Sequence, residues 1–75
     1  MFTIEHEFDA TVITLVDDGG APLQEDVVVH VTESAVLLNQ YDPRNDRTVS
    51  ISLSPEQWRD LTAALHLPEG VYRAE

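Results

Sequence analysis

The stretch from Thr48 to Leu61, TVSISLSPEQWRDL, decides the fold because it joins two secondary-structure patterns. Apolar residues at every second position from 49 to 53 alternate with small polar ones, which is typical of a strand with one covered face. Ser54 then supplies a helix N-cap, Pro55 suits the first helical position, and Gln57 completes a capping box. The sequence therefore predicts a strand followed at once by a helix.

The helix is expected over 55–66, because Pro68 stops it and because apolar residues recur at helical spacing. Trp58, Leu61 and Leu65 form one apolar stripe along it. We expect these three side chains to be largely buried against one face of a sheet.

Working back from this stretch, the chain predicts three more strands. Residues 2–8 alternate apolar and acidic, and 11–16 continue as a β-branched run with apolar residues in both phases. We expect one strand over 2–16 that either bends near Asp9-Ala10 or is covered on both faces. Residues 27–31 and 35–41 form a second and a third strand, joined by a hairpin turn at 32–34.

The expected architecture is a single α+β domain over residues 1–75. It consists of a four-stranded antiparallel β-sheet followed by one C-terminal α-helix packed on it, in the order ββββα. Such a short chain can bury only a marginal core. We therefore expect self-association, as a homodimer, or a docked partner.

The composition narrows the class of protein. A hydrophobic fraction of 43% argues for a folded chain although the net charge is −10. The absence of cysteine excludes disulfides and thiolate metal sites. The chain has no signal-peptide pattern and no apolar run of membrane-spanning length, so we expect a cytoplasmic protein that does not contact a membrane.

The acidic charge is concentrated in the first part of the chain. Nine of the fourteen acidic residues lie in 1–43, which contains no Lys or Arg, and the four basic residues are all Arg, in 44–75. A halophilic or GC-rich source and a functional role explain this acidity equally well. The functional hypothesis places an acidic binding surface on six residues: Glu5, Glu7, Asp17, Asp18, Glu25 and Asp26.

Sites for catalysis and metals are not indicated. The three histidines, His6, His30 and His66, lack metal-ligand spacing; His6 and His30 could meet across strands, but all three are interpreted as partly buried polar residues. The segment 17–20, DDGG, is interpreted as a solvated turn, because it lacks the alternating ligands of a calcium loop. No phosphate cradle or nucleophile motif occurs, so we predict a non-enzymatic protein without cofactor or metal.

The segment 40–43, QYDP, followed by 49–61, resembles the C-terminal half of the positive cofactor four family, small coactivator-like proteins that bind single-stranded DNA. In that family an aromatic-Asp-Pro turn leads to a basic loop, a strand of the I-S-L type and a helix that opens with Pro-Glu-Gln-Trp or similar. The resemblance covers residues 40–66. It implies a four-stranded sheet with one helix, and a dimer that completes the core. The basic side chains by which the family binds DNA are reduced here to Arg44 and Arg47.

Two functions follow as hypotheses. The first is a non-enzymatic interaction module that binds a basic protein surface, in the manner of a nucleic-acid mimic that regulates or inhibits its partner. The second is a divergent single-stranded nucleic-acid binder that uses Arg44, Arg47 and Tyr41. A net charge of −10 favours the first and makes nucleic acid an unexpected partner.

Overall fold

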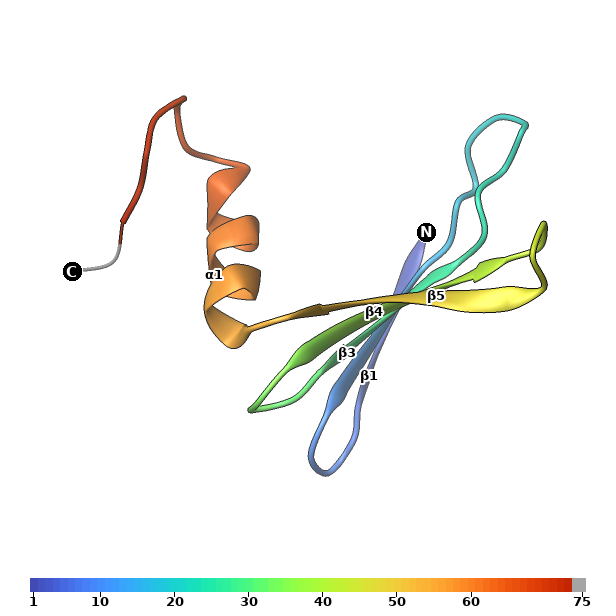
Figure 1. Cartoon of the computed structure of the whole chain (residues 1–75), viewed down its shortest axis with the longest axis horizontal. Coiled ribbons are helices and arrows are strands. Elements are labelled where there is room, and N and C mark those ends of the chain that lie inside the picture. Colours follow the sequence, from blue (N-terminus) through green and yellow to red (C-terminus); the bar gives the residue numbers. More distant parts are fainter. Residues whose placement is uncertain (74–75) are drawn as a thin grey trace.

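Five antiparallel strands and one helix make up the computed structural model, which describes residues 1–73. The strands form one sheet in the order β1-β2-β3-β4-β5, so that each strand pairs with its neighbour in sequence (Figure 1). The α+β class, the antiparallel sheet and the single C-terminal helix are therefore confirmed. The elements are β1 (Phe2–His6), β2 (Thr11–Leu15), β3 (Val27–Val31), β4 (Val36–Asp42), β5 (Arg47–Leu53) and α1 (Pro55–Ala64).

The prediction of one strand over 2–16, and hence of four strands, is wrong. The chain reverses after His6, and the Glu7 N–H donates to the Ala10 carbonyl over 2.8 Å. The resulting hairpin pairs Phe2 with Leu15. Directly paired residues share a face, so even-numbered side chains of β1 lie beside odd-numbered ones of β2. This reversal explains why the residues of the apolar face are even-numbered before it and odd-numbered after it; Val12 lies on the other face.

Two other turns have local causes. At the predicted turn between β3 and β4, the Thr32 N–H donates to the Ala35 carbonyl over 3.0 Å, and the Thr32 hydroxyl donates to the same carbonyl. In the turn between β4 and β5, Asp46 has a φ of 49°, a left-handed conformation that Asp tolerates better than most residues. Both turns are short, which keeps consecutive strands adjacent.

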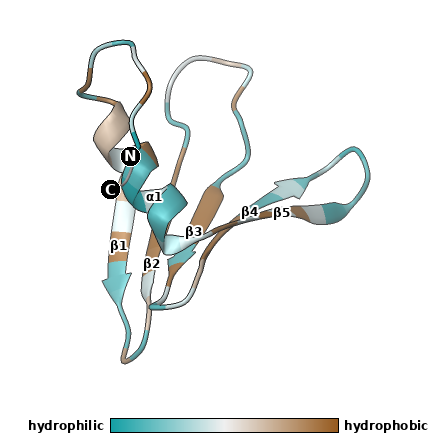
Figure 2. Cartoon of the chain, turned by 60° about the vertical axis from the view of Figure 1, so that its left-hand side comes forward, coloured by the Kyte–Doolittle hydropathy of each residue, from teal (hydrophilic) through white to brown (hydrophobic). Residues whose placement is uncertain are grey.

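The register divides the sheet into two faces. Twelve aliphatic or aromatic side chains lie on one, here called the apolar face, and small or polar ones predominate on the other, the polar face. Figure 2 shows hydrophobic residues gathered along the strands. The apolar face carries Phe2, Ile4, Ile13, Leu15, Val27, Val29, Val31, Val36, Leu38, Val49, Ile51 and Leu53. The polar face carries Thr3, Glu5, Val12, Thr14, Val28, His30, Leu37, Asn39, Tyr41, Thr48, Ser50 and Ser52.

The capping box that begins α1 is confirmed. The Gln57 N–H donates to the Ser54 hydroxyl over 3.1 Å, and the Ser54 N–H donates to the Gln57 side-chain oxygen over 3.0 Å. The helix ends at Ala64, two residues earlier than expected, and Leu65 is its C-cap.

The expected packing of the helix across its own sheet is wrong. Only β5 makes more than marginal contact with α1, which stands beyond the end of that strand (Figure 1). Trp58 is half-buried, whereas Leu61 and Leu65 are 50% and 79% exposed. The reason is the link between the two elements. Ser54 alone separates β5 from α1 in an extended conformation, whereas connections between a strand and a helix usually need two to six residues to reverse the chain.

The core of the single chain is correspondingly small. Among residues 1–73, only Val29 and Val36 are buried hydrophobic residues, with 2% and 1% of their surface exposed. Both lie on the apolar face of central strands, where neighbouring strands cover them from either side. Within the same range, no helix has the length and apolar character that crossing a membrane requires.

We predict that Ser54→Ala melts most of α1 at protein concentrations too low for self-association. An isolated helix of ten residues is marginal, and loss of a Ser N-cap costs about 1 kcal/mol, or about five-fold in the helix–coil equilibrium. Far-ultraviolet circular dichroism should show reduced helicity, whereas Ser52→Ala, on the exposed polar face of β5, should leave it unchanged. Equal spectra for the two variants would contradict the role assigned to the cap.

Candidate functional site

The meander gathers its connections at two ends of the sheet. The 16–26 connection and the 43–46 turn lie at one end, here called the long-loop end, and the 7–10 and 32–35 turns lie at the other, the short-turn end (Figure 1). The predicted acidic surface is therefore divided. Four of its members are at the long-loop end, Glu7 is at the short-turn end, and Glu5 lies on the polar face of β1. The four are Asp17, Asp18, Glu25 and Asp26.

Asp17 organises the connection at the long-loop end. Its two carboxylate oxygens accept the Gln24 N–H at 2.9 Å and the Gly19 N–H at 3.1 Å. Both bonds favour the ionised form, and together they hold the pKa of Asp17 below its ordinary value of 3.8. The predicted solvated turn at 17–20 is thus an ordered turn built on one carboxylate.

Of the other acids in this connection, Asp18 is paired and two are open to a partner. Asp18 lies 3.2 Å from the N-terminal ammonium group of Met1, which is the one ion pair found within residues 1–73. Glu25 and Asp26 are exposed, and Glu25 contributes only its backbone carbonyl, which accepts a 3.0 Å hydrogen bond from Gln40 Nε2. Their carboxylates have no Arg within ion-pairing distance in the described part of the chain.

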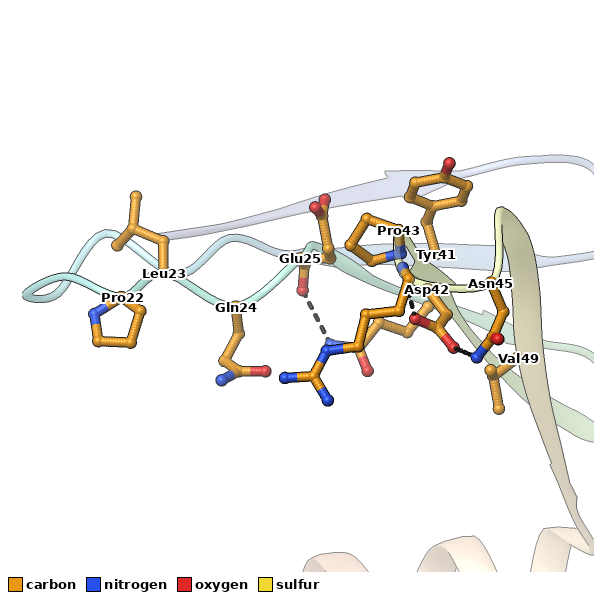
Figure 3. A pocket seen from close by; sticks show the side chains of 11 residues that line it. Pro22, Leu23, Gln24, Glu25, Tyr41, Asp42, Pro43, Asn45 and Val49 are labelled. Carbon is orange, nitrogen blue, oxygen red and sulfur yellow. Dashed lines mark hydrogen bonds between the residues drawn. The ribbon is translucent and has the colours of Figure 1, made fainter.

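A shallow groove at the long-loop end separates the 16–26 connection from the β4–β5 hairpin (Figure 3). Its walls include Leu23, Glu25 and Tyr41, and its charged lining also contains Asp42 and Arg44. Figure 3 shows Tyr41 on the opposite side of the hairpin from Asp42. The lining of the groove thus contains two carboxylates, of Glu25 and Asp42, and one guanidinium group, of Arg44.

The basic residues predicted for nucleic-acid contact lie on this hairpin but not on one surface. Arg47 pairs with Asp42 in the register and so shares the apolar face with it, whereas Tyr41 pairs with Thr48 on the polar face. Arg44 lies in the turn, where its backbone N–H donates to Asp42. Neither guanidinium group has a carboxylate within 4.0 Å among the described residues.

The carboxylates beside these arginines are engaged by other donors. Asn45 Nδ2 donates to Asp42 over 2.7 Å, and this bond, with that from the Arg44 N–H, lowers the pKa of Asp42 from 3.8. The Tyr41 hydroxyl donates to Asp46 over 2.6 Å, and this bond raises the pKa of Tyr41 above 10.0. The exposed ring of Tyr41 is thus held next to a negative charge.

A second acidic groove was not predicted. It lies at the short-turn end between the β1–β2 and β3–β4 turns, and its lining includes the acids Glu7, Asp9 and Glu33 together with Phe8, which is fully exposed. No Lys or Arg lines it. A signal in the sequence could have located this groove. The apolar positions change from even to odd numbers near Asp9-Ala10, which indicates a reversal of the chain there. Such a reversal brings the 7–10 turn beside residues 32–34.

The histidines are exposed rather than partly buried, and the expected proximity of two of them does not occur. His6 lies on the apolar face of β1, whereas His30 lies on the polar face of β3, with β2 between these strands. His66 follows the helix. Over residues 1–73, no group of three or more His, Cys, Asp or Glu side chains could hold a metal ion.

We predict that the Asp17 carboxyl group titrates below pH 3.8 and that the Gly19 and Gln24 amide protons shift over the same pH range. Because its pKa in the folded protein is lowered, the carboxylate stabilises the connection above the ordinary pKa, and this contribution is lost as the pH falls through the lower one. NMR titration measures the pKa of the Asp17 carboxyl group and the chemical shifts of the two amide protons. In Asp17→Asn the two amide protons should no longer titrate; shifts that persist in this variant would contradict the assignment.

Of the three comparisons with known proteins, only that with family models found a match. No curated protein and no solved structure matches the chain. Residues 3–64, which include almost all of β1 and every later strand together with α1, match the family described as "Domain of unknown function (DUF8831)". Because the match covers most of the sequence, the chain belongs to this family.

Proposed function

We propose that the protein is a non-enzymatic interaction module that binds a basic protein surface through the long-loop end of its sheet. The observation that supports this is the set of carboxylates there without a guanidinium partner in the described chain, above all those of Glu25 and Asp26. Asp17 and the N-terminus order the connection that carries them. The basic groove of a nucleic-acid-binding protein is one surface of suitable charge.

The physical basis is the field that these acids produce together. Asp42 and Asp46 lie in or beside the adjacent hairpin, so the long-loop end carries six acids against Arg44, Arg47 and the N-terminal ammonium group. Like charges so close together raise the local negative potential over about a Debye length, roughly 8 Å at physiological salt. Such a potential accelerates association with a cationic surface and makes it sensitive to salt.

A single-stranded nucleic-acid binder is the second candidate function. The observation in its favour is the hairpin, where Tyr41 is 43% exposed and the guanidinium groups of Arg44 and Arg47 are unpaired within residues 1–73. Two arginines supply at most about two phosphate contacts. Tyr41 and Arg47 point to opposite faces, and Asp46 holds a negative charge at the tyrosine hydroxyl. These features favour the acidic module.

We predict that Glu25→Lys with Asp26→Lys weakens binding of a labelled lysine-rich peptide by at least about ten-fold, because reversed charge at the docking surface repels the probe. The matched control is Glu56→Lys with Asp60→Lys, which changes the net charge equally on the exposed helix. Fluorescence anisotropy at physiological salt measures both. Equal weakening by the two pairs would mean that net charge alone binds the probe, which would refute the proposed surface.

We predict no binding of a labelled single-stranded oligonucleotide at physiological salt, because repulsion by the acids at the long-loop end exceeds the attraction of two arginines. The same titration with Arg44→Ala and Arg47→Ala combined is the control. Tight binding that this double variant abolishes would replace the acidic module by the nucleic-acid function.

A further inference from the structure

Two apolar surfaces of the chain are uncovered. On the apolar face, Phe2 and Ile51 of the edge strands are 63% and 58% exposed. Along the helical stripe Trp58 is half-buried, whereas Leu61 and the C-cap residue Leu65 are 50% and 79% exposed. A contiguous exposed apolar patch on a soluble protein is typical of an interaction site. One surface is broad and formed by strands, and the other is a narrow helical stripe.

The total exposed area indicates how much surface a partner must cover. The chain exposes 6446 Å², whereas a compact folded monomer of 8.4 kDa exposes about 4,600 Å². The excess of about 1,800 Å² matches the area that a subunit of an obligate homodimer loses, which is more than about 1,000 Å² per partner. The radius of gyration, 14.6 Å, also exceeds the value of about 11 Å for a compact chain of this length.

The helix of the same chain does not cover the exposed sheet. Ser54 is the whole connection between β5 and α1, and its extended backbone, with a ψ of 159°, directs the helix away from the sheet. A second copy has no such restriction. It carries both the helical stripe and the apolar face, so two copies can each cover the sheet of the other and close the assembly with two-fold symmetry.

Each copy carries −10, so two copies repel each other at long range, but the acids do not lie on the two surfaces that would meet. Three rows of paired residues cross the apolar face, beginning at Phe2, Ile4 and His6 of β1, and none of them contains an acid. Asp42 lies at the edge of this face, directly opposite Arg47. The helical stripe is likewise free of acids, because Asp60 lies on the far side of the helix. The acids at the two ends of the sheet stay in water.

We propose that two copies of this chain form a reciprocal dimer in which α1 of each packs on the apolar face of the other. The dimer completes the core that the single chain lacks. Glu25 and Asp26 lie in the 16–26 connection, outside the paired strands of the apolar face, although Val49 of that face also lines the groove at the long-loop end. The dimer can therefore be tested separately from the proposed function, which rests on these two acids.

The oligomeric state tests the proposal first. Sedimentation equilibrium in moderate salt, which screens the charge repulsion, should give twice 8.4 kDa. Leu61→Glu should weaken dimerisation by at least about ten-fold, because it places a charge in the interface. Ala63→Glu adds the same charge to the opposite side of the helix and should leave dimerisation unchanged. A wild-type monomer at high concentration and high salt would overturn the proposal, as would equal effects of the two variants.

Cysteine cross-linking tests the arrangement with mild substitutions that leave the fold intact. The chain has no cysteine, so every disulfide reports an engineered pair. A chain with Ile51→Cys mixed with one carrying Leu61→Cys should cross-link under oxidising conditions, and Ser52→Cys mixed with Ala63→Cys should not. Cross-linking mainly between two Ile51→Cys chains would indicate sheet-to-sheet packing and would overturn the reciprocal arrangement.

Discussion

The single residue between β5 and α1 is the constraint on which the rest of the structure depends. Ser54 continues the extended backbone of the strand, and its hydroxyl and N–H group immediately begin the helix through the capping box. A connection with no spare residue has no room to reverse the chain. The helix therefore extends beyond the sheet, and the apolar surfaces of both elements remain uncovered within one chain.

The meander separates the two kinds of surface that the chain presents. Side chains alternate across each strand, and the register brings most aliphatic strand residues to one face, with Val12, Val28 and Leu37 on the other. Connections between antiparallel neighbours can lie only at the ends of the strands, and most of the acids are in those connections. The apolar face and most of the acids are consequently presented in different directions, and the two kinds of surface meet at Asp42 and Val49, which lie on the apolar face and line the long-loop groove.

The family match is consistent with treating sheet and helix as one unit. It extends from Thr3 to Ala64 and so ends where α1 ends. The resemblance of residues 40–66 to the positive cofactor four family stays a prediction from the sequence, because the family that matches is a different one.

Local features of this protein follow from the sequence alone. The capping box, the turn at Thr32 and the alternation of β5 were all predictable, because each depends on residues a few positions apart. Of the candidate site, the acidic character of the first part of the chain could be predicted, but its division between two ends of the sheet could not.

Tertiary structure alone decided the number of strands and the small contact between the helix and its own sheet. The reversal after His6 becomes clear only when Phe2 is seen to pair with Leu15, thirteen residues away. The separation of Tyr41 from Arg47 likewise depends on the register of β4 and β5. The reason is that pairing and register are set by contacts between segments distant in sequence, whereas periodicity reports only which side of its own strand a residue occupies.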